Sequence, residues 1–238
     1  MSPLRRDVRG QAVTSWLLDS WLLRLIALRP FCEIPVTTKG GEIVREASRN
    51  PQGMLLCSAH LPLVNACLQS LMEMKCCPSA VVAQSSVMPD GRYPVWGHGR
   101  PVAGIAMDGL VLVRVRSVLR RGGSVAILVD NHFCESYSSH VFQLSRAVGA
   151  QVVFMIPELQ RDGQILIEFS SPPDPLCCSE ETIGLNLLAL RSKVDGVLQG
   201  RSEKTPSEGA PAATLGVESA RLSASVDPST WKGGVFDR

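Results

Sequence analysis

Short runs of apolar residues alternate with amphipathic segments along most of the chain. The apolar runs at 54–59, 80–84, 124–130, 151–156 and 164–169 have the length of strands. Most of them lack the alternation of apolar and polar residues that marks a strand with one solvent-exposed face. They therefore predict strands that are buried on both faces. Such strands are typical of the parallel centre of an α/β sheet.

The amphipathic segments predict helices at 11–29, from Pro62 to Met74, at 107–121 and at 139–149. Proline suits the first turn of a helix, and glycine residues follow the last two segments as stop signals. The valine run inside 107–121 is also compatible with a strand. Residues 85–104 are rich in glycine and proline and predict a loop with turns.

The alternation of strands and helices predicts an α/β domain with a mixed, largely parallel central sheet flanked by helices. The last two strands are separated by a polar stretch with Asp162-Gly163, which predicts a hairpin. We divide the chain into an N-terminal helix (1–29), the α/β domain (30–199) and a linker with a short C-terminal helix (200–238). The last segment is polar and rich in proline and glycine at its start.

The helix predicted at 11–29 carries Trp16 and Trp21 among leucines, and its apolar face is interrupted by Asp19 and Arg24. Tryptophan and leucine next to basic residues are typical of a helix that lies in a membrane interface. A helix that covers the domain core is the alternative, and one helix could do both. No window of 18 uncharged apolar residues and no signal peptide are evident, so we expect peripheral association without spanning.

Composition narrows the class of protein. Hydrophobic residues make up 45% of the 238 residues, and the formal net charge is +2. A nearly neutral chain argues against a dedicated nucleic-acid binder. None of the eight cysteines forms a CxxC pair, so we expect no metal site and interpret them as buried free thiols in a reducing compartment. They are Cys32, Cys57, Cys67, Cys76, Cys77, Cys134, Cys177 and Cys178.

The candidate for chemistry is His60, which lies between the apolar run at 54–59 and the helix that follows it. Ligands bind at strand ends in open α/β sheets, and an imidazole there can take a proton from a hydroxyl near neutral pH. Asn65, five residues on, could fold back and orient the imidazole. The alternative is a structural or capping histidine. The sequence has no GxSxG, P-loop or GxGxxG motif.

The order of three segments resembles the lipid A biosynthesis (lauroyl/myristoyl) acyltransferases, within the wider lysophospholipid acyltransferases. These segments are CEIPVTTKGGEIVREASRNPQGMLLCSAH, LRRGGSVAILVDNH and FQLSRAVGAQVVFMIPELQRDGQILIEFSSPP. The resemblance covers about residues 30–175, and the terminal VDPSTWKGG is similar to the Pro-x-x-Trp ending of the family.

The resemblance implies roles for five residues. His60 matches the catalytic base of an H-x4-D/E motif, and Asn65 occupies the position of its acid. An amide can orient the imidazole but cannot offset the imidazolium charge. Asp130 matches the strand-end acid of the family and would position the site. Arg92 or Arg100 would bind an anionic substrate group.

The implied activity is transfer of a fatty acyl chain from an acyl-thioester to a hydroxyl of a lipid or saccharolipid. The donor would be acyl carrier protein or coenzyme A, with no cofactor and no metal. The implied place is the cytoplasmic face of the bacterial inner membrane. Asn65 favours an alternative, a weakened or inactive homologue that binds lipid or a carrier. The basic stretch 114–121 could bind an acidic carrier or anionic head groups, or be a solvated helix face.

Overall fold

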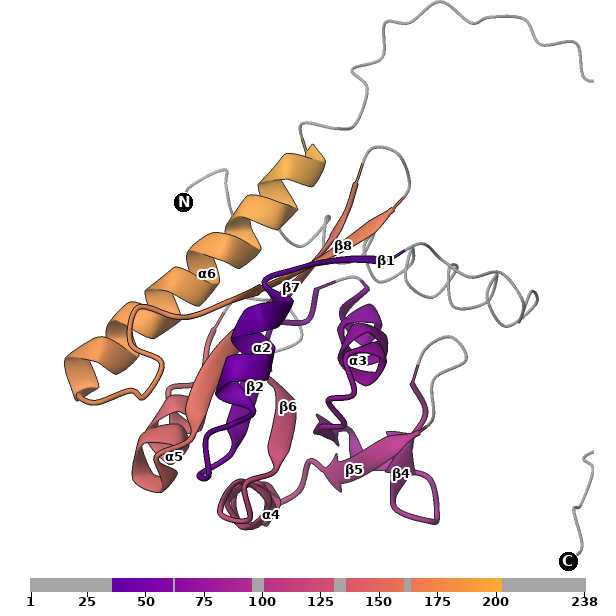
Figure 1. Ribbon diagram of the computed structural model, residues 1–238, viewed down its shortest axis with the longest axis vertical. Coiled ribbons are helices and arrows are strands. Elements are labelled where there is room, and N and C mark those ends of the chain that lie inside the picture. Colours follow the sequence, from indigo (N-terminus) through magenta and orange to yellow (C-terminus); the bar gives the residue numbers. More distant parts are fainter. Residues whose placement is uncertain (1–35, 62, 96–100, 131–135, 161–163, 203–238) are drawn as a thin grey trace, which may run out of the picture. The chain divides into compact units, whose positions relative to one another are not determined.

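The computed structural model describes residues 36–61, 63–95, 101–130, 136–160 and 164–202. The helix expected at 11–29, the C-terminal segment after residue 202, and Arg100 lie outside these residues. Eight strands form one sheet in the order β1-β8-β7-β2-β6-β3-β5-β4 (Figure 1). The strands are β1 (Val36–Lys39), β2 (Met54–Ser58), β3 (Ser79–Val82), β4 (Arg92–Tyr93), β5 (Val102–Ala106), β6 (Ser124–Leu128), β7 (Gln151–Leu159) and β8 (Ile165–Ser170).

The centre of the sheet is parallel, as the apolar runs predicted. Strands β7, β2, β6, β3 and β5 all run in one direction. The two sides are mixed, because β8 is antiparallel to β7, β1 is parallel to β8, and β4 is antiparallel to β5. The predicted fold class is therefore confirmed, and so is the β7–β8 hairpin pairing.

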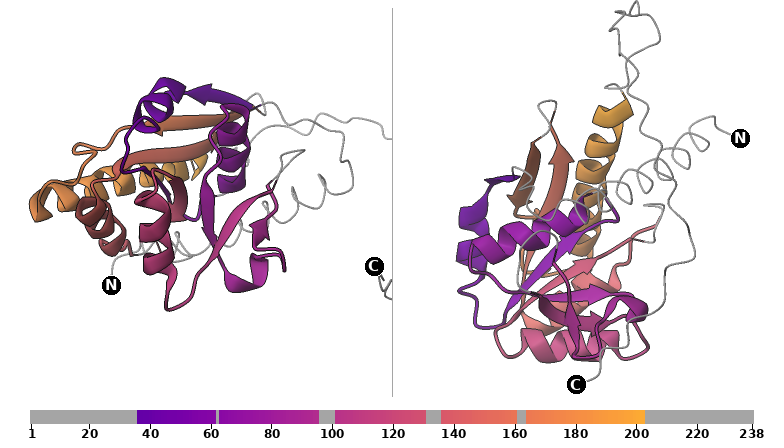
Figure 2. Two further views of the ribbon diagram at one scale, coloured as in Figure 1. Left: turned by 60° about the horizontal axis from the view of Figure 1, so that its bottom comes forward. Right: turned by 90° about the vertical axis from the view of Figure 1, so that its right-hand side faces the viewer.

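Helices cover both faces of the sheet (Figure 2). On one face, α2 (Gly41–Ala47) and α3 (Val64–Glu73) pack with Met54, Leu56 and Val153 of the strands. On the other face, α4 (Val111–Leu119), α5 (His140–Val148) and α6 (Glu180–Ser202) pack with the alternate strand residues, such as Leu55 and Val152. Each apolar strand therefore contributes to two cores, which explains its lack of polar alternation.

Several elements differ from the sequence analysis. Strand β4, most of strand β5 and most of a short 3₁₀ helix, Gln84–Ser86, lie in the segment 85–104 that was expected to be a loop. Helix α6 covers residues 180–199, to which no element was assigned, and continues three residues into the expected linker. The valine run inside 107–121, which was compatible with either a helix or a strand, is helix α4. In the part of the chain that the structure describes, no helix is long and apolar enough to cross a membrane.

Candidate functional site

Two adjacent parallel strands bring His60 and Asp130 together. Strands β2 and β6 are paired in register up to Ser58 and Leu128, and Val129 N donates to Ser58 O at 2.9 Å beyond that point. His60 and Asp130 each follow two residues after the last pair. They therefore meet at the carboxyl edge of the sheet, where ligands bind in open α/β folds.

One carboxylate oxygen of Asp130 forms two hydrogen bonds with His60. Asp130 Oδ1 lies 2.9 Å from His60 Nδ1 and 2.9 Å from the backbone nitrogen of His60. A carboxylate accepts hydrogen bonds, so Nδ1 carries the ring hydrogen and Nε2 is the nitrogen that can accept a proton. The arrangement selects one tautomer and fixes the plane of the ring, which is the requirement for a general base.

Burial differs between the two partners. The side chain of Asp130 is fully buried, whereas that of His60 is 23% exposed. Asp130 Oδ2 is buried without a hydrogen-bond partner in the described part of the chain. A buried carboxylate interacts strongly with a nearby positive charge, because little solvent screens the pair. Asp130 is therefore placed to stabilise an imidazolium on His60, while part of the imidazole stays exposed to solvent.

Asn65 has a different partner from the one expected. Tyr93 of β4 donates its hydroxyl to Asn65 Oδ1 at 3.1 Å, and burial raises the pKa of Tyr93 above its ordinary value. Leu63 has a left-handed backbone (φ 67°), so α3 begins only at Val64 and carries Asn65 toward β4. His60 Nδ1 bonds Asp130, and the expectation that Asn65 orients the imidazole stays a prediction.

The structure does not join Arg92 to this site. Its side chain is exposed, and Nε lies 3.6 Å from Asp90 Oδ2. Neighbouring residues of a strand point to opposite faces, so Arg92 points away from the side on which Tyr93 reaches α3. A substrate role for Arg92 stays a prediction, and Arg100 lies outside the described residues. Tyr93 is the residue that the sequence analysis missed, because no local pattern pairs it with Asn65.

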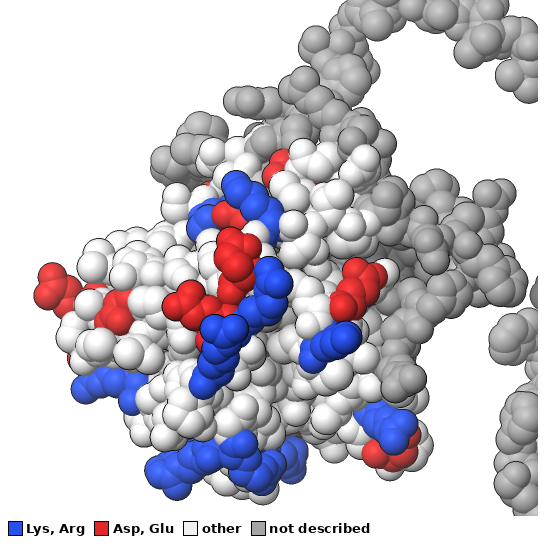
Figure 3. Space-filling model, viewed as in Figure 1, with Lys and Arg blue, Asp and Glu red and all other residues white. Residues whose placement is uncertain are grey.

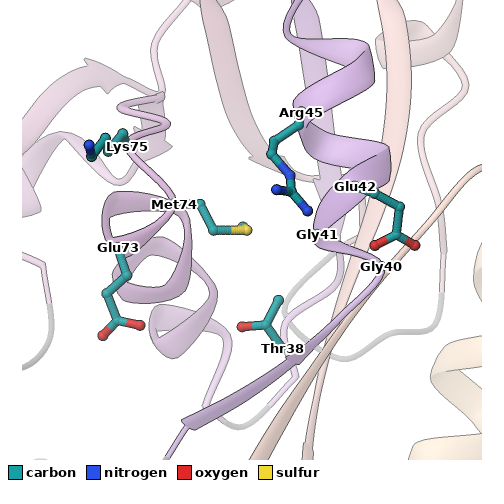
Figure 4. Close-up of a pocket in the computed structure, with 8 residues that line it drawn as sticks. All are labelled: Thr38, Gly40, Gly41, Glu42, Arg45, Glu73, Met74 and Lys75. Carbon is teal, nitrogen blue, oxygen red and sulfur yellow. The ribbon is translucent and has the colours of Figure 1, made fainter.

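A pocket of about 410 Å³ lies at the opposite edge of the sheet from His60 (Figure 4). Thr38 of β1, Arg45 of α2 and Met74 just after α3 point into it. Helix α3 runs from the carboxyl edge back to the amino edge of the parallel strands, so its end lies far from its start. This polar pocket is not the elongated apolar one that an acyl chain needs, and an apolar pocket beside His60 stays a prediction.

The six described cysteines are free thiols, as expected, but Cys76 is only half-buried and Cys77 and Cys178 are exposed, which corrects the interpretation that they are buried. Cys57, Cys67 and Cys177 are buried, and burial raises the pKa of each, that of Cys177 to about 11. Thiols with raised pKa are poor nucleophiles near neutral pH. Among the residues with described positions, no three histidine, cysteine or acidic side chains cluster as metal ligands would.

No protein-family model matches the chain, and no curated protein sequence matches it. The resemblance to lipid A acyltransferases therefore stays a prediction from the segments quoted above. The geometry of His60 and Asp130 is independent of that resemblance, since it follows from the sheet of this chain.

The position of Asn65 leads to a testable expectation. In Asn65→Asp, the new carboxylate can still accept from Tyr93, and Asp130 already occupies His60 Nδ1. We therefore expect any His60-dependent turnover to change by less than about threefold, equivalent to about 0.7 kcal/mol. Steady-state rates of the variant and the unchanged chain provide the measurement. A tenfold gain would mean that Asp130 does not supply the charge that the imidazole needs.

Proposed function

We propose that the chain is an acyltransferase that moves a fatty acyl group from a thioester to a hydroxyl of a lipid or saccharolipid. The observation that carries the proposal is the hydrogen bond between Asp130 Oδ1 and His60 Nδ1. It supplies the base and the acid that the H-x4-D/E motif would have supplied in one segment. The resemblance contributes the classes of donor and acceptor, either acyl carrier protein or coenzyme A thioesters as donors.

The mechanism uses the two side chains in sequence. His60 Nε2 accepts the proton of the acceptor hydroxyl as its oxygen attacks the thioester carbonyl. Asp130 stabilises the imidazolium that forms. The tetrahedral intermediate then collapses, the carbon–sulfur bond breaks, and the departing thiolate takes the proton from Nε2. The products are an ester and a free thiol, and neither a covalent enzyme intermediate nor a metal takes part.

The fold offers one further support for this assignment. Tyr137, seven residues after Asp130, pairs with it in an isolated antiparallel bridge. Ser138 N also donates to Val129 O at 2.7 Å. The chain therefore returns to the strand end and holds the Asp130 backbone on both sides. Rigid placement of the acid is what catalysis by a fixed imidazole requires.

The test is acyl transfer by the purified full-length chain. Acyl carrier protein and coenzyme A thioesters of several chain lengths are offered with hydroxyl-bearing lipids and saccharolipids, and esters are detected by mass spectrometry. General-base catalysis contributes about 10²- to 10⁴-fold, so we expect His60→Ala to lower the rate by that factor.

The matched control is His140→Ala. His140 is exposed at the start of α5, and its ring lies 3.2 Å from Ser138 Oγ, so we expect an unchanged rate. Product formation that survives in His60→Ala would assign the base elsewhere. Binding of lipid or thioester without product in any donor–acceptor pair would favour the non-catalytic homologue.

A further inference from the structure

We propose that α4 and the turn before it form a docking surface for an anionic lipid bilayer. We call this surface the α4 patch. It consists of four exposed aliphatic side chains and three exposed arginines: Met107, Leu110, Leu112, Val113, Arg116, Arg120 and Arg121. The proposal goes beyond the proposed reaction, since binding to a bilayer does not require turnover.

The aliphatic half of the patch is exposed to solvent. Met107, Leu110, Leu112 and Val113 are 52%, 58%, 40% and 64% exposed. The inner face of α4 is already buried through Val115 and Leu119, so rotation of the helix cannot cover them. Adjacent exposed aliphatic residues on a single helix mark a surface that another phase or molecule covers.

The basic half follows along the same helix. Arg116, Arg120 and Arg121 are exposed, and within the described part of the chain none of them makes an ion pair. Arg121 donates to Ser117, and the arginine of α4 that forms an ion pair is Arg114, which lies 2.9 Å from Asp108. In Figure 3 basic side chains gather at the bottom of the view, where Figure 1 places α4.

The order of the two halves fits a bilayer. Leu110, Val113, Ser117 and Arg120 recur at helical spacing on the outward side of α4, and Leu110 and Arg120 are about 15 Å apart along the axis at 1.5 Å per residue. A bilayer surface offers phosphates to arginines, and it offers acyl chains to aliphatic groups that enter about 5–10 Å. A tilted α4 can therefore place both halves at their proper depth.

The patch also lies near the candidate site. Strands β5 and β2 are parallel members of the same sheet, so Met107, just after β5, and His60, just after β2, lie at the same edge. The aliphatic end of α4 begins at that edge, and the basic end points away from it. Docking through the patch would bring the membrane to the edge that carries His60.

The test is co-sedimentation of the full-length chain with vesicles of phosphatidylcholine, with and without phosphatidylglycerol. Each basic residue near an anionic surface contributes about 1 kcal/mol, so Arg116→Gln/Arg120→Gln should weaken binding to the anionic vesicles about 30-fold. Leu110→Asp/Val113→Asp should weaken binding at least tenfold, because the aliphatic groups no longer enter the acyl region.

Matched variants elsewhere serve as controls. Arg45→Gln/Arg49→Gln removes the same charge from exposed positions on and just after α2, and Leu185→Asp/Leu188→Asp alters exposed leucines on α6. We expect both to bind as the unchanged chain does. Thermal unfolding of every variant checks that folding is retained. Equal losses in the patch and control variants, or none in the patch variants, would overturn the proposal.

Amide hydrogen exchange identifies the surface directly. Anionic vesicles should slow exchange over residues 107–121. Vesicle binding that protects only other segments, such as 11–29, would contradict the proposal. Protection of 107–121 by an acidic acyl carrier protein and not by vesicles would contradict it as well, and would make the α4 patch a carrier-docking surface.

Discussion

Replacing Asp130 by asparagine is expected to lower acyl transfer by about 10³- to 10⁴-fold. The amide still accepts a hydrogen bond, but it carries no charge to stabilise the imidazolium on His60. In the serine protease triad the same replacement costs about 10⁴-fold. Each factor of ten corresponds to about 1.4 kcal/mol in the activation free energy. Single-turnover rates with a thioester donor would provide the measurement.

Two controls separate the charge of Asp130 from its contribution to folding. Asp195→Asn changes an aspartate whose side chain is 47% exposed and lies 3.8 Å from Arg191 on α6, and we expect no effect on the rate. Circular dichroism and thermal unfolding of Asp130→Asn should show a folded protein. A rate within tenfold of the unchanged chain, in a folded variant, would remove Asp130 from the mechanism.

Gly40→Ala is expected to destabilise the fold by about 3 kcal/mol or more. Gly40 has φ +78°, and a Cβ there would lie 2.0 Å from the carbonyl oxygen of Phe169. Phe169 belongs to β8, the strand with which β1 pairs, so the clash would separate two neighbouring strands. A backbone oxygen cannot move aside as a flexible side chain can, which explains the size of the effect. Denaturant unfolding would measure the free energy.

Gly91→Ala is the matched control for that experiment. Gly91 has nearly the same conformation, φ +77°, but a Cβ there would meet nothing within 4 Å. Its cost is the left-handed backbone alone, about 1 kcal/mol. The difference between the two variants therefore measures the contact with Phe169. Equal losses would show that β1 can shift away from β8 at little cost.

Much of the fold could be predicted because its strands are buried on both faces. The runs at 54–59 and 124–130 have no polar alternation, and both are central strands. Strand β5, Val102–Ala106, was missed because only Val102 and Ile105 are buried and because Pro101 and Gly104 interrupt the apolar pattern. Helix α6 has a weak amphipathic pattern that sequence periodicity did not reveal.

The site could be predicted only in part, for a similar reason. His60 and Asp130 each follow a predicted strand, so both were candidates. Their contact depends on β6 lying next to β2, although α3, β3, β4, β5 and α4 separate the two strands along the chain. Local spacing instead favoured Asn65, five residues from His60. The left-handed Leu63, which turns Asn65 toward Tyr93, leaves no trace in the pattern of apolar and polar residues.

The position of β2 between β6 and β7 also sets when the His60–Asp130 contact can form during synthesis of the chain. Both neighbours follow β2 late in the chain, and the donor and acceptor in the His60–Asp130 contact are 70 residues apart. As the chain leaves the ribosome, Leu55 and Leu56 have no strand beside them until residues 124–128 have emerged. Such long-range pairing is slow and leaves apolar edges exposed in the nascent chain. The dyad is therefore a late product of folding, and no fragment that ends before Asp130 can contain it.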